Sequence, residues 1–485
     1  MALHGRPRSK GRRTATALGC VVAVLAVGGA AYQLGMDDAQ RPRLQSLATP
    51  GQPTQLPALR FPAVPAVETS AQVLGPVQTA PSLRRAALRA AVTPAVSAPV
   101  LGPHVGLVVH DPTHGKQLLN LNGSDAFVPA STTKLFTVAA ALAAIDPTTR
   151  FRTMVVSAGG SRRIVLTGGG DPLLARRTPP AGPTVDGYPQ PATMARLATA
   201  TARALDRRDV SSVRLGLDAT LFAGPAASPA WEPDYLYNVV SPITALWVDG
   251  GRAADSSERS RDPVLAAGAA FAAQLQRHGI SVRGQPSAAS APANGRTLAF
   301  VESPPMAQIA EHILATSDNE AAEVLLRHVA LASGRPASFT GGVTAVRQVL
   351  SRLGLGLSRV RLYDGSGLSR DNRLPLETLV AVLRLAADDE RPQLRAVLSG
   401  LPVAGFSGSL GYRFSADGTD AARGFVRAKT GTLSHVSLFA GSVRTASGTA
   451  LTFALAADRV SLADTTAARE AMDRVASALA ACDCR

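Results

Sequence analysis

The sequence predicts an α+β protein in which an antiparallel sheet flanked by helices is interrupted by an inserted α/β unit. Strand candidates stand at both ends of the folded region, as a hairpin in residues 105–122 and as three adjacent strands in residues 424–457. Such a hairpin and such a set of strands can pair into one antiparallel sheet. Between them, residues 151–295 alternate short strand candidates with helical stretches and loops rich in Pro and Gly. This alternation favours an inserted unit.

The N-terminus has the pattern of an export signal. Five basic residues among the first thirteen precede an uncharged stretch, residues 14–36, that is rich in Ala, Val and Gly. At about 1.5 Å rise per residue, a helix of this length spans about 30 Å of hydrocarbon. Residues 1–36 are therefore predicted to be a signal peptide or a signal anchor, with anchorage to the cytoplasmic membrane favoured. In both cases the rest of the chain is expected outside the cytoplasm, in the cell envelope.

Residues 37–80 are predicted to be a Pro/Ala-rich linker. Seven prolines punctuate this stretch, and its apolar residues show no period of 3.6 or 2. A polyproline-like chain of this length reaches on the order of 100 Å. A domain attached through it can work well away from the bilayer.

Residues 81–150 and 296–485 are predicted to form the main domain. After the hairpin, apolar residues recur at helical spacing behind Pro129, which places Ser131 at the N-terminal end of a helix. The later part is expected to contain a long helical segment, two helices, three strands and a last helix, at residues 305–328, 341–353, 375–387, 424–428, 436–444, 450–457 and 464–481.

Composition and charge exclude several classes of protein. Hydrophobic residues make up 46% of the 485 residues and charged residues 18%, which excludes disorder throughout. Residues 1–100 hold eleven of the 50 basic and three of the 35 acidic residues, so the remainder holds 39 basic and 32 acidic residues, a net charge of +7. We therefore expect no concentrated basic face on the folded part and no nucleic-acid partner.

The three cysteines predict neither a disulfide framework nor a metal site. Cys20 lies in the apolar N-terminal stretch, and Cys482 and Cys484 lie at the end of the chain. Two ligands without a partner cluster do not make a metal site. We expect no metal and no cofactor.

Three short motifs occur in order along the chain. They are Ser131-Thr-Thr-Lys134, Ser317-Asp318-Asn319 and Lys429-Thr430-Gly431-Thr432. The whole sequence holds four lysines, and two of them fall inside these motifs. Each motif taken alone is expected to occur by chance at most about 0.5 times in a chain of this composition. The chance that all three occur in this order is well below about 1%. We therefore interpret the motifs as parts of one site.

The residue types suit nucleophilic catalysis. Side chains three residues apart share one face of a helix, so Lys134 lies beside Ser131 and can accept its hydroxyl proton if the amine is neutral. A second ammonium, that of Lys429, would lower the pKa of Lys134 by like-charge repulsion, and partial burial would add to the effect. The backbone N–H of Ser131, with a second N–H from the strand that carries Thr432, can bind a developing oxyanion.

The other motif residues suit a peptide that ends in a carboxylate. Asn319 can orient an amide, and Ser317 can relay a proton to a leaving amine. The hydroxyls of Thr430 and Thr432, together with the ammonium of Lys429, suit a terminal carboxylate.

Each motif also has a purely structural interpretation. Ser131 could be only a helix cap, which contributes about 1 kcal/mol. Residues 317–319 could simply begin a helix, and residues 429–431 could simply end a strand. A helix cap at Ser131 does not need Lys134, however. Three structural motifs that match this pattern in this order by chance are less probable than a single site built from all three.

The sequence resembles a known family. Residues 127–137, Phe-Val-Pro-Ala-Ser-Thr-Thr-Lys-Leu-Phe-Thr, are similar to the active-site helix of the class C low-molecular-mass penicillin-binding proteins, the D-alanyl-D-alanine carboxypeptidase/endopeptidase family. Gly168-Gly-Gly-Asp-Pro172 and the stretch Asp-Gly-Ser-Gly-Leu-Ser-Arg at residues 364–370 match the same family. The resemblance extends from about residue 81 to the end of the chain.

The resemblance implies a fold, an activity and residue roles. It implies a penicillin-binding/β-lactamase-like catalytic domain from residues 81–150 and 296–485, with residues 151–295 inserted. It also implies peptidoglycan stem peptides as substrates and β-lactams as covalent inhibitors, with Ser131 as acyl-enzyme nucleophile and Lys134 as base. The implied catalytic partners are Ser317, Asn319 and Lys429, and the implied substrate-binding residues are Asp318, Arg370, Thr430, Gly431 and Thr432.

Three further points limit what the resemblance implies. The gap of 186 residues between Ser131 and Ser317 is short against relatives with two inserted domains, so only one is expected to be complete. A β-lactamase needs a deacylating Glu after the Ser-Asp-Asn motif, whereas Glu232 precedes it. A catalytically inactive wall-binding protein would carry a broken motif, and none is broken.

Overall fold

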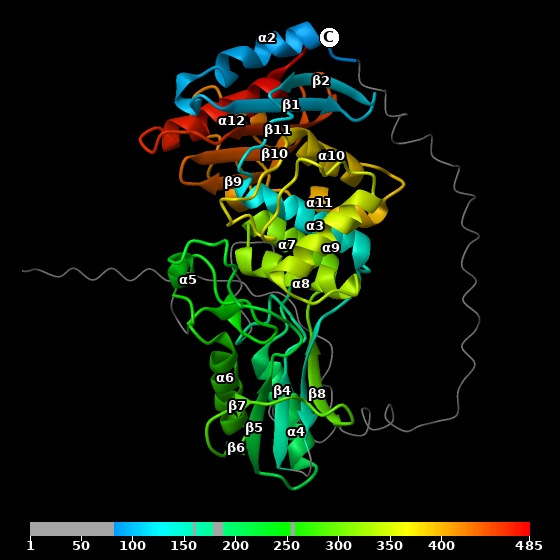
Figure 1. Ribbon diagram of the computed structural model, residues 1–485, viewed down its shortest axis with the longest axis vertical. Coiled ribbons are helices and arrows are strands. Elements are labelled where there is room, and N and C mark those ends of the chain that lie inside the picture. Colours follow the sequence, from blue (N-terminus) through cyan, green and yellow to red (C-terminus); the bar gives the residue numbers. More distant parts are fainter. Residues whose placement is uncertain (1–81, 159–161, 178–187, 254–257) are drawn as a thin grey trace, which may run out of the picture. The chain divides into compact units, whose positions relative to one another are not determined.

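The computed structural model describes residues 82–158, 162–177, 188–253 and 258–485 (Figure 1). The signal or anchor predicted for residues 1–36 and the linker predicted for residues 37–80 lie outside the described residues. Within the described part, no helix is long and apolar enough to cross a membrane. All described elements belong to one compact unit, Gln78–Arg485.

The first sheet joins strands from both ends of the folded chain. Its order is β2-β1-β11-β10-β9, and each neighbouring pair is antiparallel. The strands are β1 (Val105–Asp111), β2 (Lys116–Leu121), β9 (Val426–Leu433), β10 (Val436–Arg444) and β11 (Ala450–Ala457). The predicted pairing of the hairpin with the three C-terminal strands is therefore confirmed.

Helices cover both faces of this sheet because its central strands are apolar on both sides. Phe439 and Phe453 pack into one core with the first and last helices, whereas Leu438 and Ala454 pack into the other core. Side chains alternate across a strand, so β10 and β11 can serve both cores. The two covering helices of the first core are α2 (Arg85–Val96) and α12 (Thr465–Ala481).

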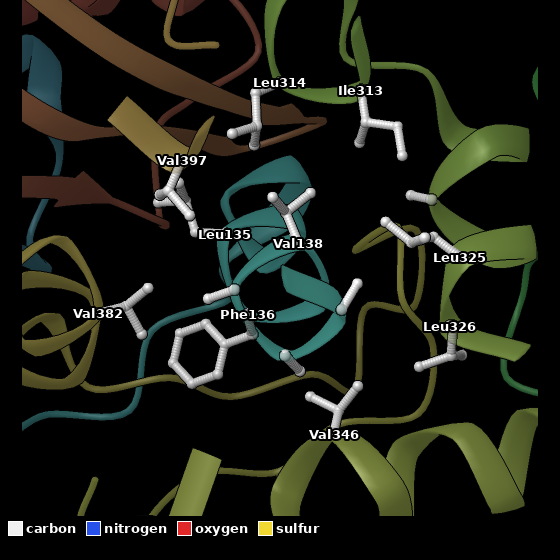
Figure 2. Packing of buried hydrophobic residues seen from close by; sticks show 14 of the residues in the cluster. Leu135, Phe136, Val138, Ile313, Leu314, Leu325, Leu326, Val346, Val382 and Val397 are labelled. Carbon is white, nitrogen blue, oxygen red and sulfur yellow. The ribbon is translucent and has the colours of Figure 1, made fainter. Parts of the chain in front are cut away.

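The second core is built around α3, whose residues are nearly all buried. Figure 2 shows Leu135, Phe136 and Val138 of this helix surrounded by aliphatic side chains from the neighbouring helices. The helices are α3 (Lys134–Ala144), α7 (Met306–Thr316), α8 (Asn319–Ala332), α9 (Phe339–Arg352), α10 (Leu376–Ala386) and α11 (Ala396–Ser399). Burial on every side fixes the position of the helix that begins just after Ser131.

One predicted helical segment, residues 305–328, is two helices in the structure. Ser317 ends α7 in the left-handed conformation with φ 62°. Asp318 then caps α8, because its Oδ1 accepts a hydrogen bond of 2.8 Å from the backbone N–H of Ala321. The continuous apolar pattern concealed this break, which holds the Ser-Asp-Asn motif at the junction.

The second sheet lies in the inserted part of the chain. Its order is β6-β5-β4-β3-β8, and β7 also pairs with β5. The strands are β3 (Arg152–Ser157), β4 (Arg163–Thr167), β5 (Ser212–Asp218), β6 (Ser281–Val282), β7 (Ser287–Ala288) and β8 (Thr297–Glu302). The helices α4 (Met194–Asp206) and α6 (Pro263–Arg277) pack in one hydrophobic core with the strands of this sheet. The short helix α5 (Tyr235–Asn238) lies between β5 and α6 in the chain. The predicted end of the inserted unit, residue 295, falls just before β8, the strand that pairs with β3 in this sheet.

The C-terminal tail differs from expectation. Cys482 and Cys484 are joined by a disulfide, which the sequence did not predict. Both residues are buried in the core that α2 and α12 share. The backbone N–H of Arg84 donates to the carbonyl oxygen of Cys484 at 2.7 Å, so the tail is held beside the beginning of α2.

The expectation of no concentrated basic face is wrong. Among the described residues, nine arginines and two acidic residues, Asp206 and Asp209, lie at one edge of the second sheet. We call this group the distal arginine patch. It consists of Arg162, Arg163, Arg203, Arg207, Arg208, Arg214, Arg277, Arg283 and Arg296.

Candidate active site

Ser131 lies in a 3-10 turn, Ala130–Thr133, that leads directly into α3. The side chain is half-buried, and its neighbours Thr132 and Thr133 are buried. The turn packs closely against the loop that contains Gly367, where a Cβ atom would lie only 1.8 Å from the carbonyl oxygen of Ala130. A glycine with φ 86° is therefore required at residue 367 to hold Ser131 in place.

Lys134 contacts three oxygen atoms. Its Nζ lies 3.0 Å from Ser131 Oγ, 2.8 Å from Asn319 Oδ1 and 2.7 Å from the carbonyl oxygen of Ser366. The side chain is fully buried. The helical spacing thus brings Lys134 to the serine hydroxyl, as the sequence predicts.

Burial lowers the pKa of Lys134 from its usual 10.5 to about 8, because desolvation disfavours the charged amine. The carboxylates of Asp364 and Glu323 act in the opposite direction and keep the pKa from falling further. At pH 7 about one amine in ten is then neutral. The expected lowering of this pKa by the charge of Lys429 is not found: burial is the cause that lowers the pKa of Lys134.

Lys429 of β9 is paired with the second motif. Its Nζ donates to Ser317 Oγ at 2.9 Å and to the carbonyl oxygen of Thr430 at 2.8 Å. This side chain is also fully buried. Burial lowers its pKa well below 10.5, and the nearby charge of Lys134 lowers it further.

The third motif lies against the turn that carries Ser131. A Cβ atom on Gly431 would lie 2.6 Å from the carbonyl oxygen of Pro129 and 3.2 Å from Thr132 Cγ2. Only a residue without a side chain allows this approach of β9. The three motifs therefore meet at one place, with Ser131, Lys134, Asn319, Ser317 and Lys429 linked by short contacts.

Comparison with known proteins agrees with this geometry. The sequence model described as the D-Ala-D-Ala carboxypeptidase 3 (S13) family matches residues 88–259 and 252–479. This chain belongs to the S13 family. A carboxypeptidase of Mycobacterium tuberculosis is 36% identical to it over 442 residues, which cover 90% of each chain. The predicted family of class C penicillin-binding proteins is confirmed, and the chain is a hydrolase of the D-Ala-D-Ala carboxypeptidase type.

Solved structures show the S13 fold. The structure of penicillin binding protein 4 from Haemophilus influenzae matches with a TM-score of 0.65 and 22% identity, covering 81% of this chain and 98% of that chain. A second structure of the same protein, complexed with a β-lactam, matches with a TM-score of 0.61. The predicted penicillin-binding/β-lactamase-like α+β fold is thereby confirmed.

The remaining predicted residues of this S13 enzyme surround the centre. Thr430 Oγ1 lies 2.8 Å from Ser409 Oγ, and Thr432 is exposed further along β9. Arg370 is half-buried, and its Nη1 donates to the carbonyl oxygen of Ser434 at 3.2 Å, just after β9 ends. Asp318 uses its side chain as the cap of α8.

A buried carboxylate network supports Lys134 and was missed by the motif search. Glu323 Oε1 accepts from the backbone N–H of Ser366 at 2.7 Å and from that of Gly365 at 3.0 Å. Burial and the charge of Asp364 raise the pKa of Glu323 to about 7. The spacing of Glu323 four residues after Asn319 on one helix was the available signal.

Asp364 fixes the other side of the same loop. Its Oδ1 accepts from the backbone N–H of Gly367 at 3.0 Å and from Asn372 Nδ2 at 2.7 Å. Its Oδ2 accepts from the backbone N–H of Ser369 and from Trp231 Nε1, at 2.6 Å and 2.9 Å. The family-like stretch at residues 364–370 thus presents the Ser366 carbonyl to Lys134.

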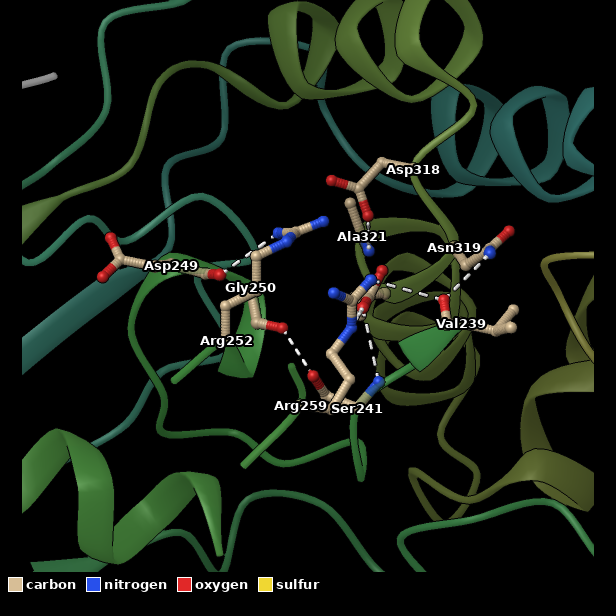
Figure 3. A network of polar contacts seen from close by, with 10 residues as sticks. Val239, Ser241, Asp249, Gly250, Arg252, Arg259, Asp318, Asn319 and Ala321 are labelled. Carbon is tan, nitrogen blue, oxygen red and sulfur yellow. Dashed lines mark hydrogen bonds and ion pairs between the residues drawn. The ribbon is translucent and has the colours of Figure 1, made fainter. Parts of the chain in front are cut away.

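The inserted part of the chain also reaches the centre. Figure 3 shows Arg259 and Val239 beside Asn319. Arg259 Nε lies 2.7 Å from Glu320 Oε1, with both side chains almost fully buried. Asn319 Nδ2 donates to the carbonyl oxygen of Val239 at 3.4 Å. A cavity of about 470 Å³ opens here between Asp249, Gly250, Arg252 and Arg259 on one side and residues 316–320 on the other.

Two absences concern the described residues alone. Within the ranges given above, no three His, Cys, Asp or Glu side chains gather in a way that could hold a metal ion. Glu232, the acid considered for a β-lactamase, is exposed on a loop before α5. No contact in the described part joins it to Ser131.

Proposed function

We propose that Ser131 attacks the carbonyl carbon of the penultimate D-alanine of a peptidoglycan stem peptide, forms an acyl-enzyme and releases the terminal D-alanine. The observation that carries this proposal is the buried contact of 3.0 Å between Lys134 Nζ and Ser131 Oγ. A serine hydroxyl is a weak nucleophile unless a base accepts its proton. Lys134, with its pKa lowered to about 8, supplies that base.

The contacts of Lys134 fix the direction of the proton transfer. A neutral amine has two N–H groups and one lone pair, whereas the ammonium form has three N–H groups. Asn319 Oδ1 and the Ser366 carbonyl oxygen can only accept, so they take the two N–H groups. The lone pair then faces Ser131 Oγ, and the hydroxyl proton moves to Lys134 as the O–C bond forms.

The proton then reaches the leaving amine through the second motif. Lys429 donates to Ser317 Oγ, which leaves the hydroxyl hydrogen of Ser317 available to the substrate nitrogen. As the C–N bond breaks, Ser317 gives its hydroxyl proton to that nitrogen and receives the proton that Lys134 took from Ser131, so Lys134 is neutral again. Water next attacks the acyl-enzyme and gives a proton to Lys134, which returns it to Ser131 Oγ as the ester bond breaks.

Substrate groups are held by the strand that carries the third motif. The backbone N–H of Ala404 donates to the carbonyl oxygen of Val426, and that of Ala428 donates to the carbonyl oxygen of Pro402, so a loop covers the first part of the β9 edge. Beyond it, the backbone N–H of Thr432 and that of Ser131 are assigned to the oxyanion. Lys429, Thr430 and Thr432 are assigned to the terminal carboxylate.

The further parts of the site have supporting roles. Asp318 positions Asn319 by capping α8. Gly431 allows β9 to approach the nucleophile. Arg370, which lies beside the end of β9, contacts the side chain of the stem peptide. Residues 81–150 and 296–485 form the catalytic domain and residues 151–295 the inserted one; the two separate sheets support this division except at residue 295, because β8 pairs with β3 of the inserted sheet.

β-Lactams are proposed to acylate the same serine. Their strained amide resembles the scissile bond, and the H. influenzae relative was solved with a β-lactam bound. Deacylation is expected to be slow because Glu232, the acid considered for a β-lactamase, is distant from the motifs in the sequence and exposed. A β-lactamase is therefore the weaker alternative.

Labelling tests the assignment of the nucleophile. A fluorescent penicillin should label the wild-type chain and should not label Ser131→Ala. Mass spectrometry of defined peptidoglycan fragments should show loss of one alanine from pentapeptides, and splitting of cross-linked dimers would reveal endopeptidase activity. A folded wild-type chain that takes up no penicillin would contradict the assignment.

Location is a separate proposal. Residues 14–36 anchor the enzyme in the cytoplasmic membrane, and residues 37–80 tether the folded part outside it. The basic flank and the length of the apolar stretch support this proposal. After cell fractionation, the chain should be found with the membranes and should retain its N-terminal residues. Release of a chain that begins after residue 36 would indicate a cleaved signal peptide instead.

A further inference from the structure

The topology of the second sheet collects the distal arginine patch at one edge. β4, β5 and β6 are parallel to one another, so all three begin at the same edge. β3 and β8 are antiparallel to their neighbours, which places the end of β3 and the start of β8 there as well. Arginines therefore converge there from four parts of the chain, residues 162–163, 203–214, 277–283 and 296.

The patch lies at the far end of the strands from the catalytic centre. β4 begins at Arg163 and ends at Thr167, and the following residues meet α8, where His328 Nε2 lies 2.8 Å from the carbonyl oxygen of Gly170. Five residues of strand span roughly 15 Å. Figure 1 shows the labels β4, β5 and β6 away from α3 and α8. The arginines are thus too far from Ser131 to contact the reacting atoms.

The positive charge of the patch is not neutralised within the described part of the chain. Eight of its nine arginines are exposed and the ninth is half-buried, and none of them forms an ion pair there. Arg163 lies directly opposite Arg214 on the neighbouring strand. Like charges placed opposite each other in a sheet are destabilising, so an external anion would relieve this repulsion.

The patch carries most of the net charge of the folded region. Nine arginines against two aspartates give +7, whereas residues 82–485 together hold 42 basic and 32 acidic residues, a net charge of +10. A surface with one concentrated basic end favours a multivalent anionic partner at that end.

We propose that the distal arginine patch binds carboxylate groups of peptidoglycan stem peptides while the catalytic centre works on another stem peptide of the same polymer. This inference rests on the proposed function, because the proposed substrate is a polymer whose stem peptides end in carboxylates. Guanidinium groups form forked hydrogen bonds with carboxylates. Several weak contacts on one polymer raise the local concentration of stem peptides at the active site.

The test compares two variants of equal charge in the full-length chain. The patch variant carries Arg163→Glu, Arg207→Glu, Arg214→Glu and Arg283→Glu. The control variant carries Arg85→Glu, Arg89→Glu, Arg444→Glu and Arg469→Glu, four exposed arginines of α2, β10 and α12. Both are prepared with Ser131→Ala, so that binding is measured without turnover, and a patch variant with Gln in place of Glu guards against misfolding.

Binding is measured on purified sacculi stripped of phosphate polymers, at about 0.1 M salt, where the screening length is about 10 Å. The patch variant should bind at least about fivefold more weakly than the control, because four exposed ion pairs are lost. Blocking the carboxylates of the sacculi with a neutral amine should reduce binding of the control to the same level. With Ser131 restored, both variants should cleave a soluble pentapeptide within about twofold of wild type.

Two results would overturn the proposal. One is equal binding of the patch and control variants to sacculi. The other is that the patch variant binds vesicles containing phosphatidylglycerol more weakly than the control yet keeps its affinity for sacculi, which would assign the patch to lipid. Failure of wild type to cleave the soluble pentapeptide would refute the proposed function, whereas the comparison on sacculi would still decide the role of the patch.

Discussion

At the scale of single residues, the chemistry depends on an amine that is buried and shielded from water. Lys134 has three oxygen neighbours, and two of them belong to residues that the sequence motifs already contain. The third, the Ser366 carbonyl oxygen, belongs to the loop held by Asp364 and Glu323. The motifs predicted the pair that reacts, but not the carboxylates that orient it, because neither Glu323 nor Asp364 belongs to one of the three motifs.

The pKa of Lys134 predicts how acylation depends on pH. Acylation requires the neutral amine, and burial lowers the pKa of Lys134 to about 8. The second-order rate constant for penicillin should therefore rise about tenfold per pH unit below pH 7 and level off above about pH 8. Stopped-flow or quenched labelling between pH 5.5 and pH 9 measures this profile. A rate that stays constant from pH 6 to pH 9 would exclude a titrating base with this pKa.

At the scale of elements, two departures from the sequence prediction concern the motifs themselves. The predicted strand 424–428 ends before Lys429, whereas β9 continues to Leu433. The predicted bounds stop too early because apolar alternation ends at the polar run Lys-Thr-Gly-Thr, although Thr432 was expected on a strand. The predicted helix 305–328 breaks at Ser317, because a single residue in the left-handed conformation leaves no mark in an apolar pattern.

The approach of β9 to the turn at Ser131 can be tested through Gly431. A Cβ atom there would lie 2.6 Å from the Pro129 carbonyl oxygen, so Gly431→Ala should push the strand away from the nucleophile. We expect penicillin acylation to slow by roughly 10²-fold, since misplacement of about 1 Å has effects of this size. The comparison variant is Gly356→Ala, where a Cβ would meet no atom within 4 Å. Equal acylation rates in both variants would argue against this packing.

At the scale of the whole molecule, the sequence predicted the closure of the first sheet and the presence of an insertion. It did not predict that the insertion contributes to the environment of the Ser-Asp-Asn motif. Arg259 and Val239 lie far from this motif in the chain, yet both contact residues of α8. The distal arginine patch was missed for a similar reason, because its arginines are spread over four segments between residues 162 and 296 that come together only in the fold.

The link between the inserted part and the catalytic domain predicts a stability difference. The Arg259–Glu320 pair is almost fully buried, so Arg259→Leu leaves a buried carboxylate unpaired and should cost about 3–5 kcal/mol of unfolding free energy. The matched change Arg152→Leu removes an exposed pair with Glu302 and should cost less than about 1 kcal/mol. Urea unfolding followed by circular dichroism compares the two. Similar losses of unfolding free energy in both variants would contradict the prediction that the buried Arg259–Glu320 pair stabilises the fold.

The most direct measurement of the central claim, that Lys134 activates Ser131, is intact and peptide mass spectrometry after brief exposure to penicillin. Wild type should carry one adduct on the peptide that contains Ser131. Lys134→Ala should keep its circular dichroism spectrum and acylate at least about 10²-fold more slowly, whereas Lys116→Ala, which alters an exposed lysine of β2, should acylate as wild type does. Acylation of Lys134→Ala at a near-normal rate, or an adduct on another residue, would contradict the account.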